Sequence, residues 1–163
     1  GIDLSASAMQ LSPMTGDEAQ LEQFLAKYNP AIAETGRAAI ALLRGRLPEW
    51  DVLVYDNYNA LAAGFTPDGG KRLQALSIAL YPRWVSLFVS ARLDDPHGLL
   101  KGSGGTVRHV VLEGGAGDLE RPEIAVLIDQ TIERAKAMID PARRGELKIA
   151  SVSAKQRPRR AGG

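Results

Sequence analysis

Apolar residues recur at helical spacing in three stretches of the chain, which predicts three α-helices. The first covers residues 16–28 and opens with a capping box, the S/T-x-x-E pattern whose side chains satisfy free backbone donors. The second begins at Asn29-Pro30, because Asn is a favoured N-cap and Pro suits the first helical position, and it ends by Gly45. The third has the longest apolar stripe and covers residues 122–139.

The stretch between the second and third helices has the composition of β-strands. Runs rich in β-branched and aromatic residues alternate with turn residues, and they cover residues 51–56, 61–65, 73–80, 83–90 and 106–113. Because these strands follow one another with no helix between them, we expect an antiparallel meander of about five strands. Residues 147–152 are expected to form a last edge strand.

Helices before and after an antiparallel sheet predict an α+β fold. In this fold, two N-terminal helices and one long C-terminal helix flank one face of the sheet. The chain of 163 residues fits a single domain. We place that domain at residues 15–153, with a flexible segment at 1–14 before it and a basic, disordered tail at 154–163 after it.

The predicted strand 83–90 has two different faces, because side chains alternate across a sheet. One face is aliphatic and consists of Val85, Leu87 and Val89. The other carries aromatic rings and hydroxyls, and consists of Trp84, Ser86, Phe88 and Ser90. We expect the aliphatic face to meet the helices. The aromatic face either forms the floor of an open groove or is covered by the 91–105 loop and forms a second small core.

Composition excludes several kinds of chemistry. The chain has no cysteine, which excludes disulfides, thiolate metal sites and a cysteine nucleophile. It has neither a G-x-S-x-G elbow nor a P-loop, and no nucleophile–base set stands out, so we expect a protein that is not an enzyme. No apolar run reaches membrane-spanning length and the start does not resemble a signal peptide, so we expect a cytoplasmic protein with no membrane partner.

Charge is distributed unevenly along the chain. From Pro141 onward there are seven Lys/Arg and one Glu, a net +6, which leaves residues 1–140 at −5 because the whole chain carries +1. A basic tail attracts polyanions, but Arg157-Pro-Arg-Arg160 contains no aromatic residue on which bases stack. Nucleic acid is therefore not expected as the main partner. Deleting residues 155–163 is expected to change stability by no more than about 0.5 kcal/mol.

Three segments carry a resemblance to a known family. The runs 51–60, 79–88 and 94–109 resemble the YdhG-like family, domain of unknown function 1801, and the resemblance covers roughly residues 18–139. It implies a small α+β domain with a frataxin-like helix–sheet–helix layout, and one branch of that family is described as iron chaperones. Tyr55-Asp-Asn-Tyr-Asn59 replaces the usual Tyr-Gly-Met-Pro-like segment, so the chain resembles a distinct branch.

The resemblance raises iron as a candidate cargo, and no other cofactor is indicated. Hard cations prefer carboxylate oxygens, and the first helix offers Asp17, Glu18 and Glu22. A second group of oxygen and nitrogen donors, Asp94, Asp95 and His97, lies in a predicted loop. Both groups are also typical of structural roles, since acidic residues favour a helix start and Asp-Pro initiates turns.

The leading hypothesis is a non-enzymatic domain that binds a small molecule or a partner protein through the open sheet face and the 91–105 loop. The candidate binding residues combine aromatic bodies, polar tips and two cations, and are Tyr55, Asn57, Tyr81, Trp84, Phe88, Lys101 and Arg108. One alternative is weak iron binding by the first helix. A second is nucleic-acid binding through the basic tail.

Overall fold

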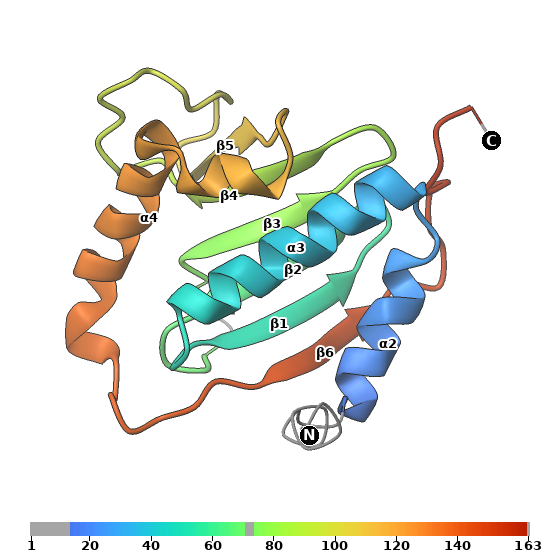
Figure 1. Ribbon diagram of the computed structural model, residues 1–163, viewed down its shortest axis with the longest axis horizontal. Helices are drawn as coiled ribbons and strands as arrows, with labels where there is room; N and C mark the ends of the chain where they lie inside the picture. Colours follow the sequence, from blue (N-terminus) through green and yellow to red (C-terminus); the bar gives the residue numbers. More distant parts are fainter. Residues whose placement is uncertain (1–13, 71–73, 163) are drawn as a thin grey trace, which may run out of the picture.

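The computed structural model describes residues 14–70 and 74–162, and it has an α+β fold (Figure 1). Its elements, in chain order, are α2 (Gly16–Leu25), α3 (Pro30–Arg46), β1 (Asp51–Asp56), β2 (Leu61–Thr66), β3 (Leu76–Leu80), β4 (Val85–Ser90), β5 (Val107–Val111), η1 (Ala116–Glu120), α4 (Pro122–Ala135), η2 (Lys136–Met138) and β6 (Leu147–Val152). The predicted fold class and the predicted order of helices and strands are confirmed.

The strands form one six-stranded sheet in the order β5-β4-β3-β2-β1-β6. The first five strands pair as the predicted antiparallel meander, and β6 adds to β1 in parallel. After α4 the chain runs back to the end of the sheet where β1 begins (Figure 1). β6 starts at that end and therefore runs parallel to β1. The predicted edge strand at 147–152 is therefore present, and it continues the sheet beyond the meander.

The helix boundaries follow local chemistry. The capping box forms as predicted, with the Thr15 amide donating to the Glu18 carboxylate at 3.0 Å and the Glu18 amide donating to the Thr15 hydroxyl at 3.1 Å. Pro30 opens α3, although the Asn29 side chain makes no capping hydrogen bond. The first helix ends at Leu25, three residues before the predicted end, and a turn follows.

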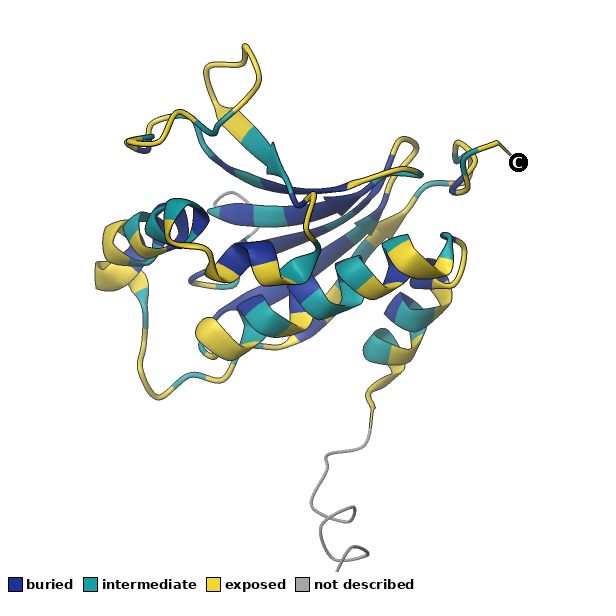
Figure 2. Cartoon of the chain, turned by 45° about the horizontal axis from the view of Figure 1, so that its top comes forward, coloured by how far each residue is buried: buried dark blue, intermediate teal, exposed yellow. Residues whose placement is uncertain are grey.

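The α-helices all lie on one side of the sheet (Figures 1 and 2). The hydrophobic core lies between these helices and the sheet. Val85, Leu87 and Val89 are almost fully buried in that core, as predicted for the helix-facing side of β4. The opposite face, called the open sheet face below, carries no helix among the described residues (Figure 2). On this face Ala62, Ser77 and Phe88 are partly exposed, whereas Ala79 and Ser86 are buried.

Tyr28 fastens the end of α2 to the sheet. Its hydroxyl donates to the Leu80 carbonyl at 2.9 Å and accepts the Leu61 amide at 3.1 Å. Burial raises the pKa of Tyr28 to about 12, so the phenol stays protonated and both hydrogen bonds persist through the neutral range.

The prediction of a disordered tail is wrong for residues 154–162. Arg159 is only 6% exposed, and its Nη2 lies 2.9 Å from the Asp56 carboxylate, which is fully buried. A buried carboxylate requires a cation, and Arg159 supplies it from more than a hundred residues further along the chain. The predicted flexible segment at 1–14 falls almost entirely outside the described residues.

The 91–105 loop takes a different place from the one expected. Its beginning is fastened to α4, because the Asp94 amide donates to Gln130 Oε1 at 2.9 Å and Gln130 Nε2 donates to the Asp94 carbonyl at 2.8 Å. Leu93 is buried in the core. Further along, Lys101 pairs with His109 as an isolated bridge beside β5. The loop is thus attached to α4 at its beginning and to the edge strand β5 near its end.

Candidate ligand-binding site

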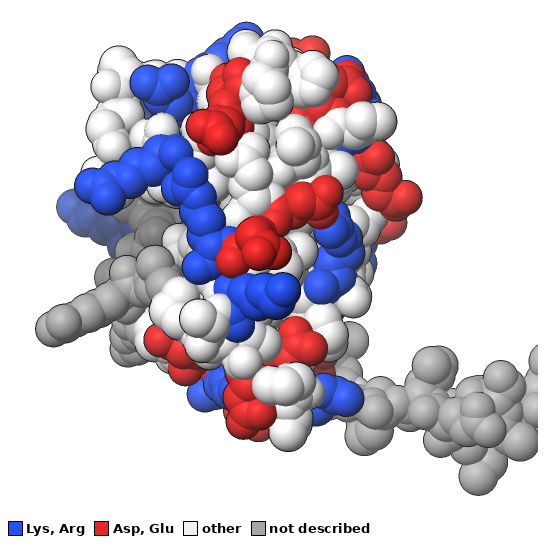
Figure 3. Space-filling model, turned by 90° about the vertical axis from the view of Figure 1, so that its left-hand side faces the viewer, with Lys and Arg blue, Asp and Glu red and all other residues white. Residues whose placement is uncertain are grey.

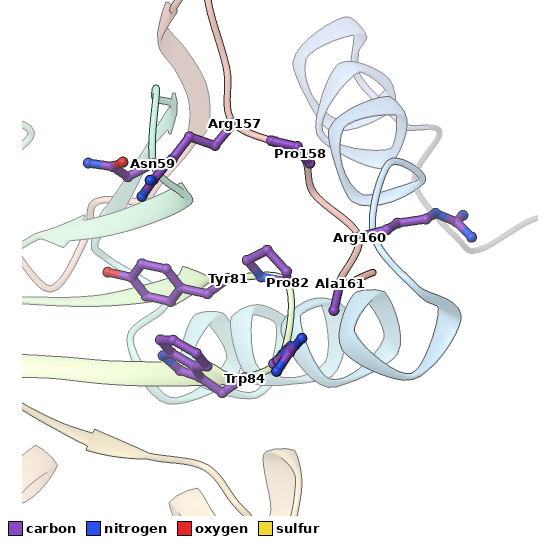
Figure 4. A pocket seen from close by; sticks show the side chains of 9 residues that line it. Asn59, Tyr81, Pro82, Trp84, Arg157, Pro158, Arg160 and Ala161 are labelled. Carbon is purple, nitrogen blue, oxygen red and sulfur yellow. The ribbon is translucent and has the colours of Figure 1, made fainter. Parts of the chain in front are cut away.

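A cavity of about 660 Å³ lies where the β3–β4 turn faces the C-terminal segment (Figure 4). Nine residues line it: Asn59, Tyr81, Pro82, Arg83, Trp84, Arg157, Pro158, Arg160 and Ala161. None of them is acidic. The cavity is therefore built by two aromatic rings, two prolines and three arginines from segments that are distant in sequence.

The β3–β4 turn presents the aromatic wall. The Tyr81 amide donates to the Trp84 carbonyl at 2.9 Å, which closes a tight turn through Pro82. The turn brings the Tyr81 and Trp84 rings together, with centroids 5.1 Å apart and an interplanar angle of 24° (Figure 4). Trp84 remains 44% exposed, so part of its ring is available to a ligand.

A buried ion pair holds the opposite wall in place. Both oxygens of the Asp56 carboxylate are paired, Oδ1 with Arg159 at 2.9 Å and Oδ2 with Lys27 Nζ at 2.6 Å. Burial by itself raises the pKa of Asp56. The hydrogen bonds that involve Lys27, Gln156 and Arg159 outweigh burial, and the pKa lies below its usual value. The carboxylate is therefore charged at neutral pH.

The anchor at Arg159 determines where the neighbouring arginines lie. The Arg157 amide donates to the Tyr58 carbonyl at 2.9 Å, and the Arg157 guanidinium lies 6.0 Å from the centre of the Tyr58 ring. Arg160 extends in the other direction (Figure 4), and its Nε donates to the Lys27 carbonyl at 3.2 Å near the end of α2. Arg157 is thus the tail arginine whose charge remains beside the aromatic wall.

The positive charge at this cavity has no acidic partner among the described residues. Arg83, Arg157 and Arg160 form no ion pair with any residue of 14–70 or 74–162. The side of the molecule that carries α4 differs, because basic and acidic side chains lie next to one another there (Figure 3). Unpaired guanidinium groups beside exposed rings can hold an anion and stack on a planar group.

A second cavity, of about 530 Å³, lies on the open sheet face. Its lining contains small residues and aromatic rings: Asn57, Tyr58, Asn59, Ala60, Ala62, Ser77, Ala79, Tyr81, Phe88 and Ser153. Phe88 packs against His109 across the strand pair, with ring centroids 5.3 Å apart. The two cavities share Asn59 and Tyr81 and are therefore adjacent.

The structure brings together most of the aromatic residues predicted from the sequence. Tyr81 and Trp84 line the first cavity, and Tyr81, Asn57 and Phe88 line the second. The Tyr55 hydroxyl accepts a hydrogen bond from Gln74 Nε2 at 2.9 Å. Tyr55 lies opposite Ala62 in the sheet, and so on the face of the second cavity.

The two predicted cations lie elsewhere. Arg108 is opposite Val89 in the β4–β5 register, which places it on the other sheet face from Phe88. Lys101 pairs with His109 at the sheet edge and lines neither cavity. The cations at the site are arginines that the sequence reasoning did not assign to it: Arg83, Arg157 and Arg160. The Arg-Pro-Arg-Arg run was visible in the sequence, but its pairing with Asp56 was not.

The candidate iron ligands on the first helix already form ion pairs or hydrogen bonds with other residues of the protein. Glu18 caps the helix and pairs with Arg44 at 2.9 Å, and Glu22 pairs with Arg37 at 2.9 Å. Asp17 accepts the Ile149 amide at 3.1 Å. The hydrogen bond from the Thr15 backbone, followed by that from Arg44, lowers the pKa of Glu18. These carboxylates fasten α2 to α3 and β6.

Among the loop donors, Asp95 is also used structurally. The Asp95 carboxylate accepts the amides of Leu99 and Leu100 at 3.0 and 2.9 Å, which closes the turn after Pro96. Across residues 14–70 and 74–162, no group of three or more His, Cys, Asp or Glu side chains is arranged to hold a metal ion. The same part of the chain contains no helix that is long and apolar enough to cross a membrane.

Comparison with known proteins gives no match to a family model, to a curated protein or to a solved structure. The site must therefore be interpreted from its own chemistry.

Proposed function

We propose that this chain is a binding domain for an anionic ligand that carries a planar ring, of the nucleotide kind. The proposed site is the cavity between the Tyr81–Trp84 pair and the C-terminal segment. One observation supports this most strongly: arginines that form no ion pair with a described residue lie beside the stacked Tyr81–Trp84 pair, whose tryptophan is exposed, in a cavity with no acidic lining residue.

The chemistry of the two walls suits the two parts of such a ligand. A guanidinium presents several N–H donors in a planar fork that matches phosphate oxygens, which supports Arg157 and Arg83 as the anion-binding groups. An aromatic face stacks on a planar ring whatever its substituents, which supports Trp84 as the ring-binding group. The volume of about 660 Å³ falls within the usual range of small-molecule sites.

The proposal is binding without catalysis. The cavity lining contains no His, Ser, Cys or carboxylate, the groups from which nucleophiles and general bases are most often drawn. Membership of the YdhG-like family and a cytoplasmic location stay predictions. No arrangement of carboxylates in the described residues favours the iron alternative.

Isothermal titration calorimetry with AMP, adenosine and inorganic phosphate tests the proposal. AMP is expected to bind at least about tenfold more tightly than either fragment, because it engages both walls. Phosphate binding as tightly as AMP, or no heat from any of the three, would contradict the proposal.

A matched pair of variants locates the site. Arg157→Gln and Arg144→Gln each remove one exposed arginine that forms no ion pair with a described residue. Losing a hydrogen bond to a charged group typically costs about 1.5–3 kcal/mol, so Arg157→Gln should weaken AMP binding by about tenfold or more. Arg144→Gln should leave it unchanged. Equal effects would show that only net charge matters.

A further inference from the structure

Building on the proposed function, we infer that the ligand is a single-stranded nucleic acid, which crosses from the Tyr81–Trp84 cavity onto the open sheet face. The first reason is continuity. The cavity beside Trp84 and the cavity beside Phe88 share Asn59 and Tyr81 as lining residues. A mononucleotide would fill one cavity, whereas a chain of nucleotides would fill both.

The second reason is that stacking surfaces are present in both cavities. Tyr58 lines the second cavity and is 51% exposed, and Phe88 presents a ring that packs against His109. The Arg157 guanidinium lies over the Tyr58 ring at 6.0 Å while Arg157 also lines the first cavity. One cation therefore stands between two stacking positions, where the phosphate that joins two nucleotides would lie.

The third reason is the floor of the second cavity. Ala62, Ser77 and Ala79 are small, so a flat ring can approach the sheet closely. The adjacent Ser86 lies opposite Ala79, and its hydroxyl is buried without a hydrogen-bond partner in the described structure. Asn57 and Asn59 at the rim offer amide donors and acceptors of the kind that read base edges.

Single-stranded nucleic acid fits these features better than a duplex or an acidic peptide. Bases in a duplex are stacked on one another and cannot reach the rings, whereas the bases of a single strand can. An acidic peptide would satisfy the arginines but would leave the stacking surfaces unused. The −5 charge of residues 1–140 and the mixed charges on the α4 side (Figure 3) also disfavour broad contact with a duplex.

The 163-residue chain is titrated with thymidine monophosphate, with a single-stranded thymidine pentanucleotide, with a DNA duplex long enough to stay paired, and with pentaglutamate. The single-stranded pentanucleotide is expected to bind at least about tenfold more tightly than the monophosphate, the duplex and the peptide. Two to three phosphate contacts predict a slope of log K against log salt of about −1.4 to −2.1.

Phe88→Ala separates the inference from the proposed function, because Phe88 lines the second cavity and not the first. It should weaken pentanucleotide binding by roughly five- to 150-fold, leave monophosphate binding unchanged, and be rescued by Phe88→Tyr, which keeps the ring. Monophosphate binding that Arg157→Gln weakens, with no gain from chain length, would overturn the inference and leave the proposed function standing. Pentaglutamate binding as tightly as the pentanucleotide would overturn the inference, and no binding of any probe would overturn both.

Discussion

The two ends of β1 are held by the same kind of ion pair but differ in what surrounds it. At one end, buried Asp51 pairs with Arg143, with Nη2 2.8 Å from Oδ2. At the other end, buried Asp56 pairs with Arg159 at 2.9 Å. The two arginines lie before and after β6 in the chain, so the pairs fasten both ends of the last strand.

The tryptophans show how the two ends differ. Trp50, beside Asp51, is 3% exposed, and the backbone packs so tightly there that a Cβ on Gly145 would lie 1.6 Å from the Trp50 carbonyl oxygen. Trp84 lies at the Asp56 end of the sheet and is 44% exposed. Arg144 near Asp51 forms no ion pair with a described residue, but the neighbouring Trp50 is enclosed. A buried ion pair marks where the chain is fastened, whereas an unpaired arginine beside an exposed ring marks a candidate site.

The largest expected contrast is between the two tryptophans. Trp50→Ala should cost about 3–5 kcal/mol of unfolding free energy, because it leaves a cavity in the core. Trp84→Ala should cost about 1 kcal/mol or less, because it removes a half-exposed ring and one stacking contact. Urea denaturation of both variants measures the difference. Similar losses would mean that Trp84 is a core residue and that the first cavity is closed.

The next contrast is between the two arginine anchors. Arg159→Ala should cost about 3 kcal/mol, the low end of the range for breaking a buried pair, because Lys27 still contacts Asp56. Arg143→Ala should cost less, about 1–2 kcal/mol, because its side chain is 31% exposed and Asp51 keeps the hydrogen bond from the Glu146 amide. Urea denaturation in parallel compares them, and a loss below about 0.5 kcal/mol for Arg159→Ala would show that the segment is not docked.

Acid should weaken both anchors. Burial raises the pKa of Asp51 and of Asp56, but their basic partners and hydrogen bonds outweigh burial, so both folded-state values lie below the ordinary 3.8. The stability from each pair is therefore fully present above pH 3.8 and is lost as the pH falls through the lower folded-state value.

Asp56→Asn tests this pH dependence against Asp51→Asn. Each variant should have a smaller difference in unfolding free energy between neutral pH and acid than the unaltered chain, because one titrating group is gone. An unchanged pH profile in Asp56→Asn would show that the carboxylate has no favourable partner in the folded state.

Local patterns predicted most of the fold. The helix starts at Thr15 and Pro30 and the alternation of Val85, Leu87 and Val89 depend on neighbouring residues, and they form as expected. The parallel direction of β6 was not predictable, because it depends on the path of the chain after α4. The docked tail depends on the pairing of Asp56 with Arg159, residues so far apart that no local pattern links them.

The candidate site was likewise predictable only where it depends on local patterns. The rings at Tyr81 and Trp84 could be found from strand alternation and a tight turn. The cations could not, because Arg157 reaches the site only through the Asp56 anchor. With that anchor, the expected cost of deleting residues 155–163 rises from about 0.5 to about 3 kcal/mol or more.

The two tryptophans also provide the most direct test of the central claim, that the cavity at the Asp56 end binds an anionic planar ligand. The ¹⁵N-labelled chain gives one indole N–H signal for Trp84 and one for Trp50, and Trp84→Phe assigns them. Titration with AMP should move the Trp84 signal to a saturating limit and leave the Trp50 signal in place. A Trp84 signal that does not move, or two signals that drift together without saturation, would contradict the account.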